Sequence, residues 1–147
     1  MSKRVIAMSL AGTAVLGAAG AVAFAAQASE AKPQVRDGEA AYVAPHGTRD
    51  GSLTFTVRVS DDSGVRGVKV LAWPGTLKPA PTAKEMKDVE SATCTAAGDG
   101  AARCTYTVRV TEADAVPAGA WHVAVLATAK DGDTAFVPRA ADFTARR

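Results

Sequence analysis

Residues 52–64 read SLTFTVRVSDDSG, and they carry the clearest local pattern in the chain. The apolar residues of this stretch, from Leu53 to Val59, alternate with polar ones. Because successive side chains of a strand point to opposite faces, this period of two predicts a half-buried β-strand over 52–60. The Asp-Asp-Ser-Gly that follows is a turn signal and ends the strand.

The same alternation recurs on both sides of this segment. Residues 121–127 are apolar on both faces apart from His122, which is typical of a central strand. Pro138 interrupts the last segment, which indicates an edge strand or a bulge. We expect seven strands: 39–44, 52–60, 65–73, one around Cys94, one from Cys104 to Val110, 121–127 and 134–144.

A short helix is expected between the third and fourth strands. Thr82-Ala83-Lys84-Glu85 matches a capping box, with Met86 and Val89 three apart behind it. A helix of one or two turns here would cover an open edge or end of the sheet. Seven short strands, turn signals at roughly 8–12-residue intervals and no long helix predict an all-β fold, an antiparallel β-sandwich.

Cys94 and Cys104 are the two cysteines of the chain. Gly98-Asp99-Gly100 between them is a turn signal that can place two adjacent strands side by side. An even pair in an exported protein is most simply a disulfide. The alternative, two metal-binding thiolates, requires further ligands, and the only histidines are His46 and His122.

The N-terminus reads as an export signal. Lys3 and Arg4 precede a stretch without charge, and Ala26-Gln27-Ala28 offers small residues at a cleavage site. The alternative is a membrane-spanning helix, since about 20 apolar residues can cross a bilayer, but interrupting glycines and a threonine weaken it. We therefore expect a signal peptide (1–28), a flexible arm (29–38) and one secreted domain (39–147).

Charge argues against two classes of partner. The chain has 17 Lys and Arg against 15 Asp and Glu. Removal of a signal that contains Lys3 and Arg4 leaves 15 of each, so the mature domain has no net charge. A neutral domain gives no electrostatic case for nucleic acid or for an anionic membrane as a partner.

No motif for catalysis or for a cofactor stands out. Only His46, in a turn, and His122, on a strand, could act as a general base, and neither lies beside a nucleophile signature. Asp61-Asp62 and the Asp131 and Asp133 pair could bind calcium, but the twelve-residue acidic loop that supplies such ligands is missing. Aspartate beside glycine more often makes a turn. We expect no enzyme, no metal and no cofactor.

Two short segments carry a family resemblance. VRVSDDSGV, residues 57–65, and PAGAWHV, residues 117–123, resemble recurring segments of bacterial extracellular immunoglobulin-like domains. The layout of residues 39–145 is similar to that of small secreted actinobacterial proteins grouped as a family of unknown function. The resemblance implies immunoglobulin-like topology. Antibody-type domains bridge their second and sixth strands, whereas Cys94 and Cys104 would bridge the fourth and fifth, so membership of the antibody superfamily is not implied.

The functional hypothesis is a non-enzymatic extracellular module that binds a secreted or cell-surface protein or a cell-surface glycan. Trp73, at a strand end before Pro74-Gly75, is a candidate partner-binding residue, and packing is the alternative. Trp121 alternates with Val123 and Val125 and is expected in the core. A second hypothesis is a protease inhibitor that presents the proline-stiffened residues 77–81, LKPAP, although no disulfide brackets them.

Overall fold

The computed structural model describes residues 32–146. The predicted signal peptide (1–28) and the first three residues of the predicted arm lie outside the described residues. Seven strands and two single 3₁₀ turns make up the described chain: β1 (Gln34–Val43), β2 (Gly51–Ser60), β3 (Val65–Pro74), η1 (Glu85–Asp88), β4 (Thr93–Ala96), β5 (Ala101–Val110), η2 (Glu112–Asp114), β6 (Gly119–Ala129) and β7 (Thr134–Ala145).

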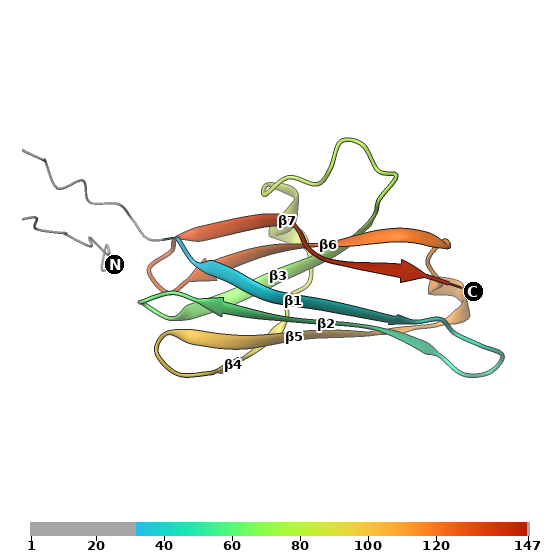
Figure 1. Cartoon of the computed structure of the whole chain (residues 1–147), viewed down its shortest axis with the longest axis horizontal. Helices are drawn as coiled ribbons and strands as arrows, with labels where there is room; N and C mark the ends of the chain where they lie inside the picture. The colour runs from blue at the N-terminus through green and yellow to red at the C-terminus, as the bar shows by residue number, and fades with distance from the viewer. Residues whose placement is uncertain (1–31, 147) are drawn as a thin grey trace, which may run out of the picture.

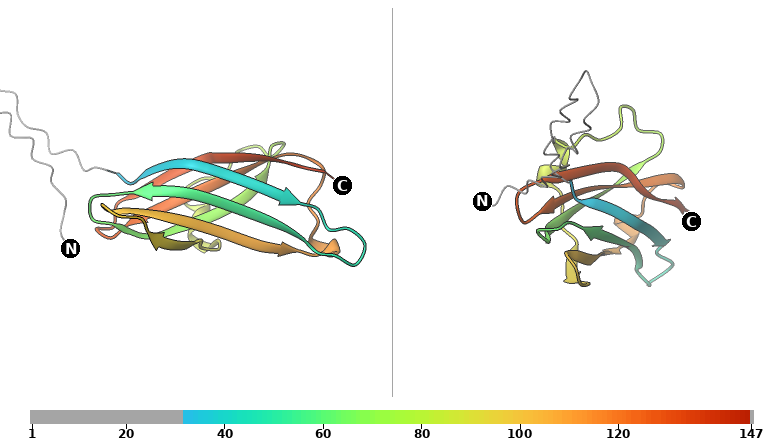
Figure 2. Two further views of the ribbon diagram at one scale, coloured as in Figure 1. Left: turned by 60° about the horizontal axis from the view of Figure 1, so that its bottom comes forward. Right: turned by 60° about the vertical axis from the view of Figure 1, so that its left-hand side comes forward.

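The strands form two antiparallel sheets that pack face to face (Figures 1 and 2). One sheet has the order β1-β2-β5-β4 and the other has the order β3-β6-β7. This is the strand order of a constant-type immunoglobulin sandwich. The predicted fold class, an all-β antiparallel sandwich of seven strands, is therefore confirmed. No helix within residues 32–146 has the length and apolar character needed to cross a bilayer.

The main core lies between the two sheets and follows the alternation seen in the sequence. The predicted inward face of β2 is fully buried, and Phe55 and Val59 have no exposed surface. The central strand β6 contributes Val123 and Val125, and β3 contributes Val68, all at 1% exposure or less. Burying side chains of this size stabilises the fold by about 1.5–3 kcal/mol each.

A second apolar cluster covers the outer face of the three-stranded sheet. Its buried members are Trp73, Met86 and Ala124, and Met86 comes from η1 in the connection between β3 and β4. The same connection also covers the β3 edge, because the Val70 N–H donates to the Glu90 carbonyl at 3.0 Å. The expected short helix is thus a single 3₁₀ turn that covers the outer face of the sheet, and the residues that follow it cover the β3 edge.

The capping box that predicts this turn is formed in part. The backbone N–H of Thr82 donates to Glu85 Oε2 at 2.6 Å, and the Thr82 hydroxyl donates to the same oxygen at 3.0 Å. These hydrogen bonds, the backbone one first, hold the pKa of Glu85 below its usual value. The Thr82 hydroxyl therefore bonds to the Glu85 carboxylate rather than to a backbone N–H of the turn.

In the first and last strands, buried and exposed residues do not alternate regularly over the whole strand. β1 begins at Gln34 and not at residue 39, so residues 34–38 of the expected arm belong to the sheet. A register shift between Arg36 and Glu39 breaks the period of two, which is why the sequence pattern does not show this part of the strand. Pro138 lies on the edge strand β7, within a register shift, as predicted.

Candidate functional site

A cleft opens between the two sheets along one side of the sandwich. β5 pairs with β2 over its whole length, but on its other side β4 pairs only with residues 102–105 of β5. Figure 1 and the left view of Figure 2 show how little of β5 the short β4 accompanies. Beyond Thr105, no strand of the described chain closes the gap between the edges of β5 and β3.

The cleft has a volume of about 550 Å³ and is mainly apolar. Its lining residues come from both sheets and from the two long connections. Most of its apolar side chains are only half-buried, because no strand within residues 32–146 covers them. The residues that line it are Tyr42, Leu53, Val70, Leu71, Ala72, Asp88, Val89, Glu90, Tyr106, Val108, Arg109, Val110, Asp114, Val116 and Trp121.

Two of the lining aromatic rings are fixed by a third. Tyr42 and Trp121 both stack on Phe143, with ring centroids 5.7 Å and 6.1 Å away. Trp121 Nε1 also donates to the Pro117 carbonyl at 2.9 Å. Trp121, expected in the core, packs against the core but stays half-buried, because it lines the cleft. Aromatic groups held in this way offer a rigid apolar surface to a ligand.

Acidic side chains dominate the charge at the cleft. Asp88, Glu90 and Asp114 line it, and Arg109, the one basic residue that lines the cleft within residues 32–146, is paired through its guanidinium with Asp50. The Tyr106 hydroxyl donates to Glu90 Oε2 at 2.6 Å, which ties β5 to the β3–β4 connection. Burial, and then the hydrogen bond and charge of Glu90, raise the pKa of Tyr106 to about 12.

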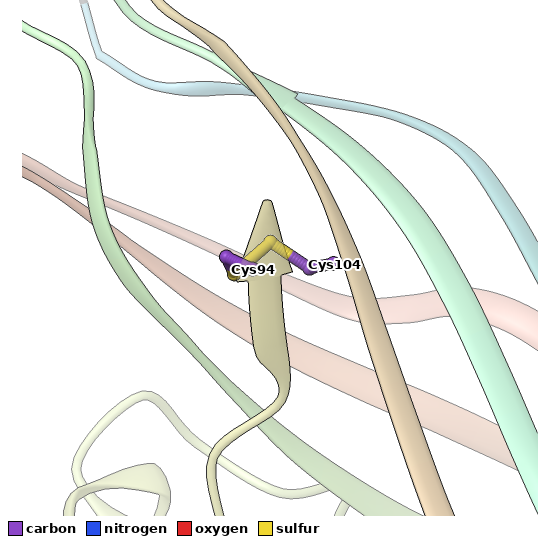
Figure 3. Close-up of a disulfide and its surroundings, with 2 residues drawn as sticks. All are labelled: Cys94 and Cys104. Atoms are coloured by element: carbon purple, nitrogen blue, oxygen red, sulfur yellow. A yellow bond between two sulfur atoms is a disulfide. The ribbon is translucent and has the colours of Figure 1, made fainter. Parts of the chain in front are cut away.

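The predicted disulfide is present. Cys94 of β4 and Cys104 of β5 face each other in the ladder, and an S–S bond of 2.05 Å joins them (Figure 3). Cys104 lies on the inward face of β5 and is fully buried. The bond anchors β4 to β5 next to the point at which β4 begins.

Partner binding and packing are the two roles that the sequence allows for Trp73. Trp73 is 8% exposed, and its Nε1 donates to the Pro138 carbonyl at 2.9 Å. Its ring lies 4.7 Å from that of His122. A side chain covered to this degree presents little surface to a partner, so its position favours packing.

The two histidines lie in different surroundings. His46 is exposed in the loop between β1 and β2, where its backbone forms a bridge with Arg49. His122 Nδ1 lies 2.6 Å from Asp142 Oδ1. Hydrogen bonds from Arg139 are the main cause that lowers the pKa of Asp142 to about 2. The His122 ring, the Asp142 carboxylate and the Arg139 guanidinium thus form one cluster of polar contacts on the outer face of the sheet.

The two acidic turns lie at the same end of the sandwich. Asp61 Oδ1 accepts hydrogen bonds from the backbone N–H and the hydroxyl of Ser63. The Ser63 oxygen accepts one from the Asp131 N–H, and Asp131 Oδ1 accepts one from the Asp133 N–H. These carboxylates thus organise the turns. Within residues 32–146, no three His, Cys, Asp or Glu side chains are grouped to hold a metal ion.

The loop of the inhibitor hypothesis stands away from the sandwich. Residues 76–80 are exposed, Leu77 at 45%, and the yellow-green segment after β3 in Figure 1 shows this loop. Pro81 is buried and marks the return of the chain to the sheet. The disulfide lies elsewhere, between β4 and β5.

The sequence pattern does not predict the cleft. The alternation of Tyr106, Val108 and Val110 predicts an inward face of β5. It does not show that no strand of the described chain lies beside this part of β5. β4 can begin only after the preceding residues leave the β3 edge. No local sequence pattern predicts the residue at which that happens.

Comparison with known proteins gives a family. The model of a family described as "Family of unknown function (DUF5707)" matches residues 35–127, which span β1 to most of β6 and include both cysteines. No curated protein and no solved structure matches the chain. The match covers more than half of the 147 residues. The chain is thus a member of the DUF5707 family.

Proposed function

We propose that the chain is exported and that its domain acts outside the cell as a non-enzymatic binding module, with its ligand in the cleft between β3 and β5. The observation that carries this proposal is the apolar cleft itself. Ligand sites are concave, mostly apolar spaces of roughly 300–1,000 Å³ with a few polar groups. The cleft, at about 550 Å³ and with two stacked aromatic residues, has these properties.

Export is supported by the disulfide and by the sequence of the N-terminus. Disulfides persist in oxidising compartments and are rare in the cytosol, and both cysteines of this chain are bonded. N-terminal sequencing of the protein recovered from the medium tests this part. We expect the first residue to be Ser29; an uncleaved chain retained in the cell would contradict export.

Binding in the cleft is tested with two matched variants. Val108→Gln places an amide in the cleft wall, whereas Thr107→Gln changes the exposed outer face one residue away. Both proteins are used to capture partners from the culture fluid and the cell wall of the producer. We expect the Val108 variant to lose the partner and the Thr107 variant to keep it, while both unfold within a few degrees of the wild type. Equal capture by both variants contradicts a site in the cleft.

The inhibitor hypothesis has one observation in its favour, the exposed loop at Leu77. Incubation with subtilisin-like and trypsin-like proteases decides between the two functions. If the wild type inhibits a protease and the variants Leu77→Gly or Lys78→Gly do not, the binding site is this loop and not the cleft. Unchanged protease activity leaves the cleft as the site.

A further inference from the structure

The backbone of β5 beside the cleft has hydrogen-bonding groups that no strand within residues 32–146 pairs with. The Ala97 N–H donates to the Ala101 carbonyl at 2.9 Å, and the Ala101 N–H donates to the Gly98 carbonyl at 2.8 Å. The polar backbone groups of Ala101 therefore point away from β2 and toward β4. β5 pairs with β2 up to Val110 without a register shift, so every second residue keeps this direction.

The pairing with β4 ends where Thr93 lies opposite Thr105. Two residues further along β5, Thr107 and then Arg109 have the same orientation but no strand beside them in the described chain. A sheet edge with a free row of N–H and C=O groups is a template for another extended segment. Val108, between these two residues, directs its side chain into the cleft.

An added strand would lie in line with β4, over the mouth of the cleft. Its side chains would alternate between the cleft and the solvent, as in any strand. The inward ones would meet Tyr42, Val108 and Trp121, whose side chains are half-buried. Main-chain bonds with pockets for alternate side chains are the features of peptide recognition by strand addition.

The charges of the residues that line the cleft indicate which residues would flank the apolar side chains of such a segment. Asp88, Glu90 and Asp114 line the cleft, and among the lining residues of the described chain the one basic side chain, Arg109, is already paired with an aspartate. Basic ends on the added segment complement this rim. A second copy of the chain, paired edge to edge about a two-fold axis, would bring the same acidic rim against itself. The charges therefore favour a basic peptide over self-association.

We propose that an extended peptide, with apolar side chains at alternate positions and Lys or Arg at its ends, adds as a strand to β5 at Thr107 and Arg109 and fills the cleft. This inference rests on the proposed function, because it names the ligand class of the same cleft.

The test uses ¹⁵N-labelled protein, purified after expression of the full chain, and synthetic peptides. The peptides carry Lys at both ends and alternate Thr with Val, Leu, Phe or Trp. We expect amide signals of Thr107, Arg109 and Trp121 to shift with at least one peptide, at concentrations up to about 1 mM. Peptides with Glu at both ends should bind several-fold more weakly, and Asp88→Asn with Asp114→Asn should reduce that difference.

Backbone methylation identifies the binding mode. Methylating the peptide nitrogens that face β5 should abolish the shifts, whereas methylating the alternate nitrogens should leave them. Thr107→Pro, which removes the edge N–H, should also abolish them, and Thr107→Ala is its control. If the proline variant does not fold, the two sets of methylated peptides still show whether the peptide binds as a strand. Equal binding of both series overturns the proposal.

The remaining outcomes separate this inference from the proposed function. If no peptide shifts any signal but a short chitin or cellulose oligosaccharide shifts Val108 and Trp121, strand addition is wrong and the cleft remains a binding site. If neither ligand shifts the cleft and Val108→Gln captures partners as the wild type does, both proposals fail.

Discussion

Removing the Cys94–Cys104 disulfide should destabilise the domain by about 2.7 kcal/mol. The bond joins residues 10 apart in sequence. The loop entropy that this cross-link removes from the unfolded chain is about 9 cal/mol/K, which gives that free energy at 25 °C. At about 2.1 cal/mol/K per residue, residues 32–146 unfold with an entropy of about 240 cal/mol/K, so the melting temperature should fall by about 11 °C.

The assay compares three proteins by circular dichroism during thermal and urea unfolding: the oxidised wild type, the reduced wild type, and the double variant Cys94→Ala, Cys104→Ala. Reduction breaks the cross-link but keeps both sulfur atoms in place. The alanine variant also removes the fully buried Cys104 sulfur from the core. We therefore expect reduction alone to cause most of the loss, and the alanine variant to lose a further amount from packing.

A shift below about 3 °C on reduction, which is under about 1 kcal/mol, would refute this reasoning. It would mean that the unfolded chain already keeps the ends of the hairpin close together, so that the bond constrains little. Thiol titration before and after reduction is needed with each measurement, because free thiols in the untreated protein would show that the bond is not formed in solution.

Three further predictions concern the residues around the cleft and the turns. Trp73→Ala should cost about 3–5 kcal/mol in urea unfolding, because it empties a packed site, and should leave partner capture unchanged; the reverse result would make Trp73 the binding residue. Gly100→Ala should cost more than about 1 kcal/mol, because a Cβ would overlap the Asp61 carbonyl, whereas Gly98→Ala, at a similar positive φ but in open space, should cost less. Because folding raises the pKa of Tyr106 from 10.0 to about 12, the stability that Tyr106 contributes should be constant below pH 10 and be lost as the pH rises from 10 to 12; Tyr106→Phe should remove that loss and the step in tyrosinate absorbance at 295 nm near pH 12.

Strands with one buried face were predictable from the sequence. Burial of every second side chain requires apolar and polar residues to alternate, and this alternation is visible in the sequence. β2 and β5 follow this pattern, with Phe55 and Cys104 fully buried. The start of β1 was not predictable, since the register shift after Arg36 exchanges the two faces within one strand. The disulfide was predictable because a turn signal lies between two lone cysteines.

The candidate site was predictable only in its parts. In the alternation of a strand, Trp73 falls out of phase with Val68 and Val70, and in the structure it packs in the other cluster, on the opposite face of β3. What covers that face, Met86, lies 13 residues further along the chain, and the pairing of the two is a tertiary contact that neither local pattern contains. The cleft likewise depends on there being no strand of the described chain beside this part of β5. No sequence pattern in β5 itself predicts that a neighbouring strand is missing.

The uncovered edge of β5 stands out because the other sheet edges of the described chain are protected. β4 is an edge strand of only four residues, and short edge strands pair poorly with other chains. The β3 edge is covered by residues 90–92. β1 meets β7 so closely at Gly38 that a side chain there would overlap the Ala140 carbonyl. An edge that stays open beside an apolar cleft, in a fold that protects its other edges, supports the proposal that a ligand covers it, since an exposed edge of this kind is otherwise a site of aggregation.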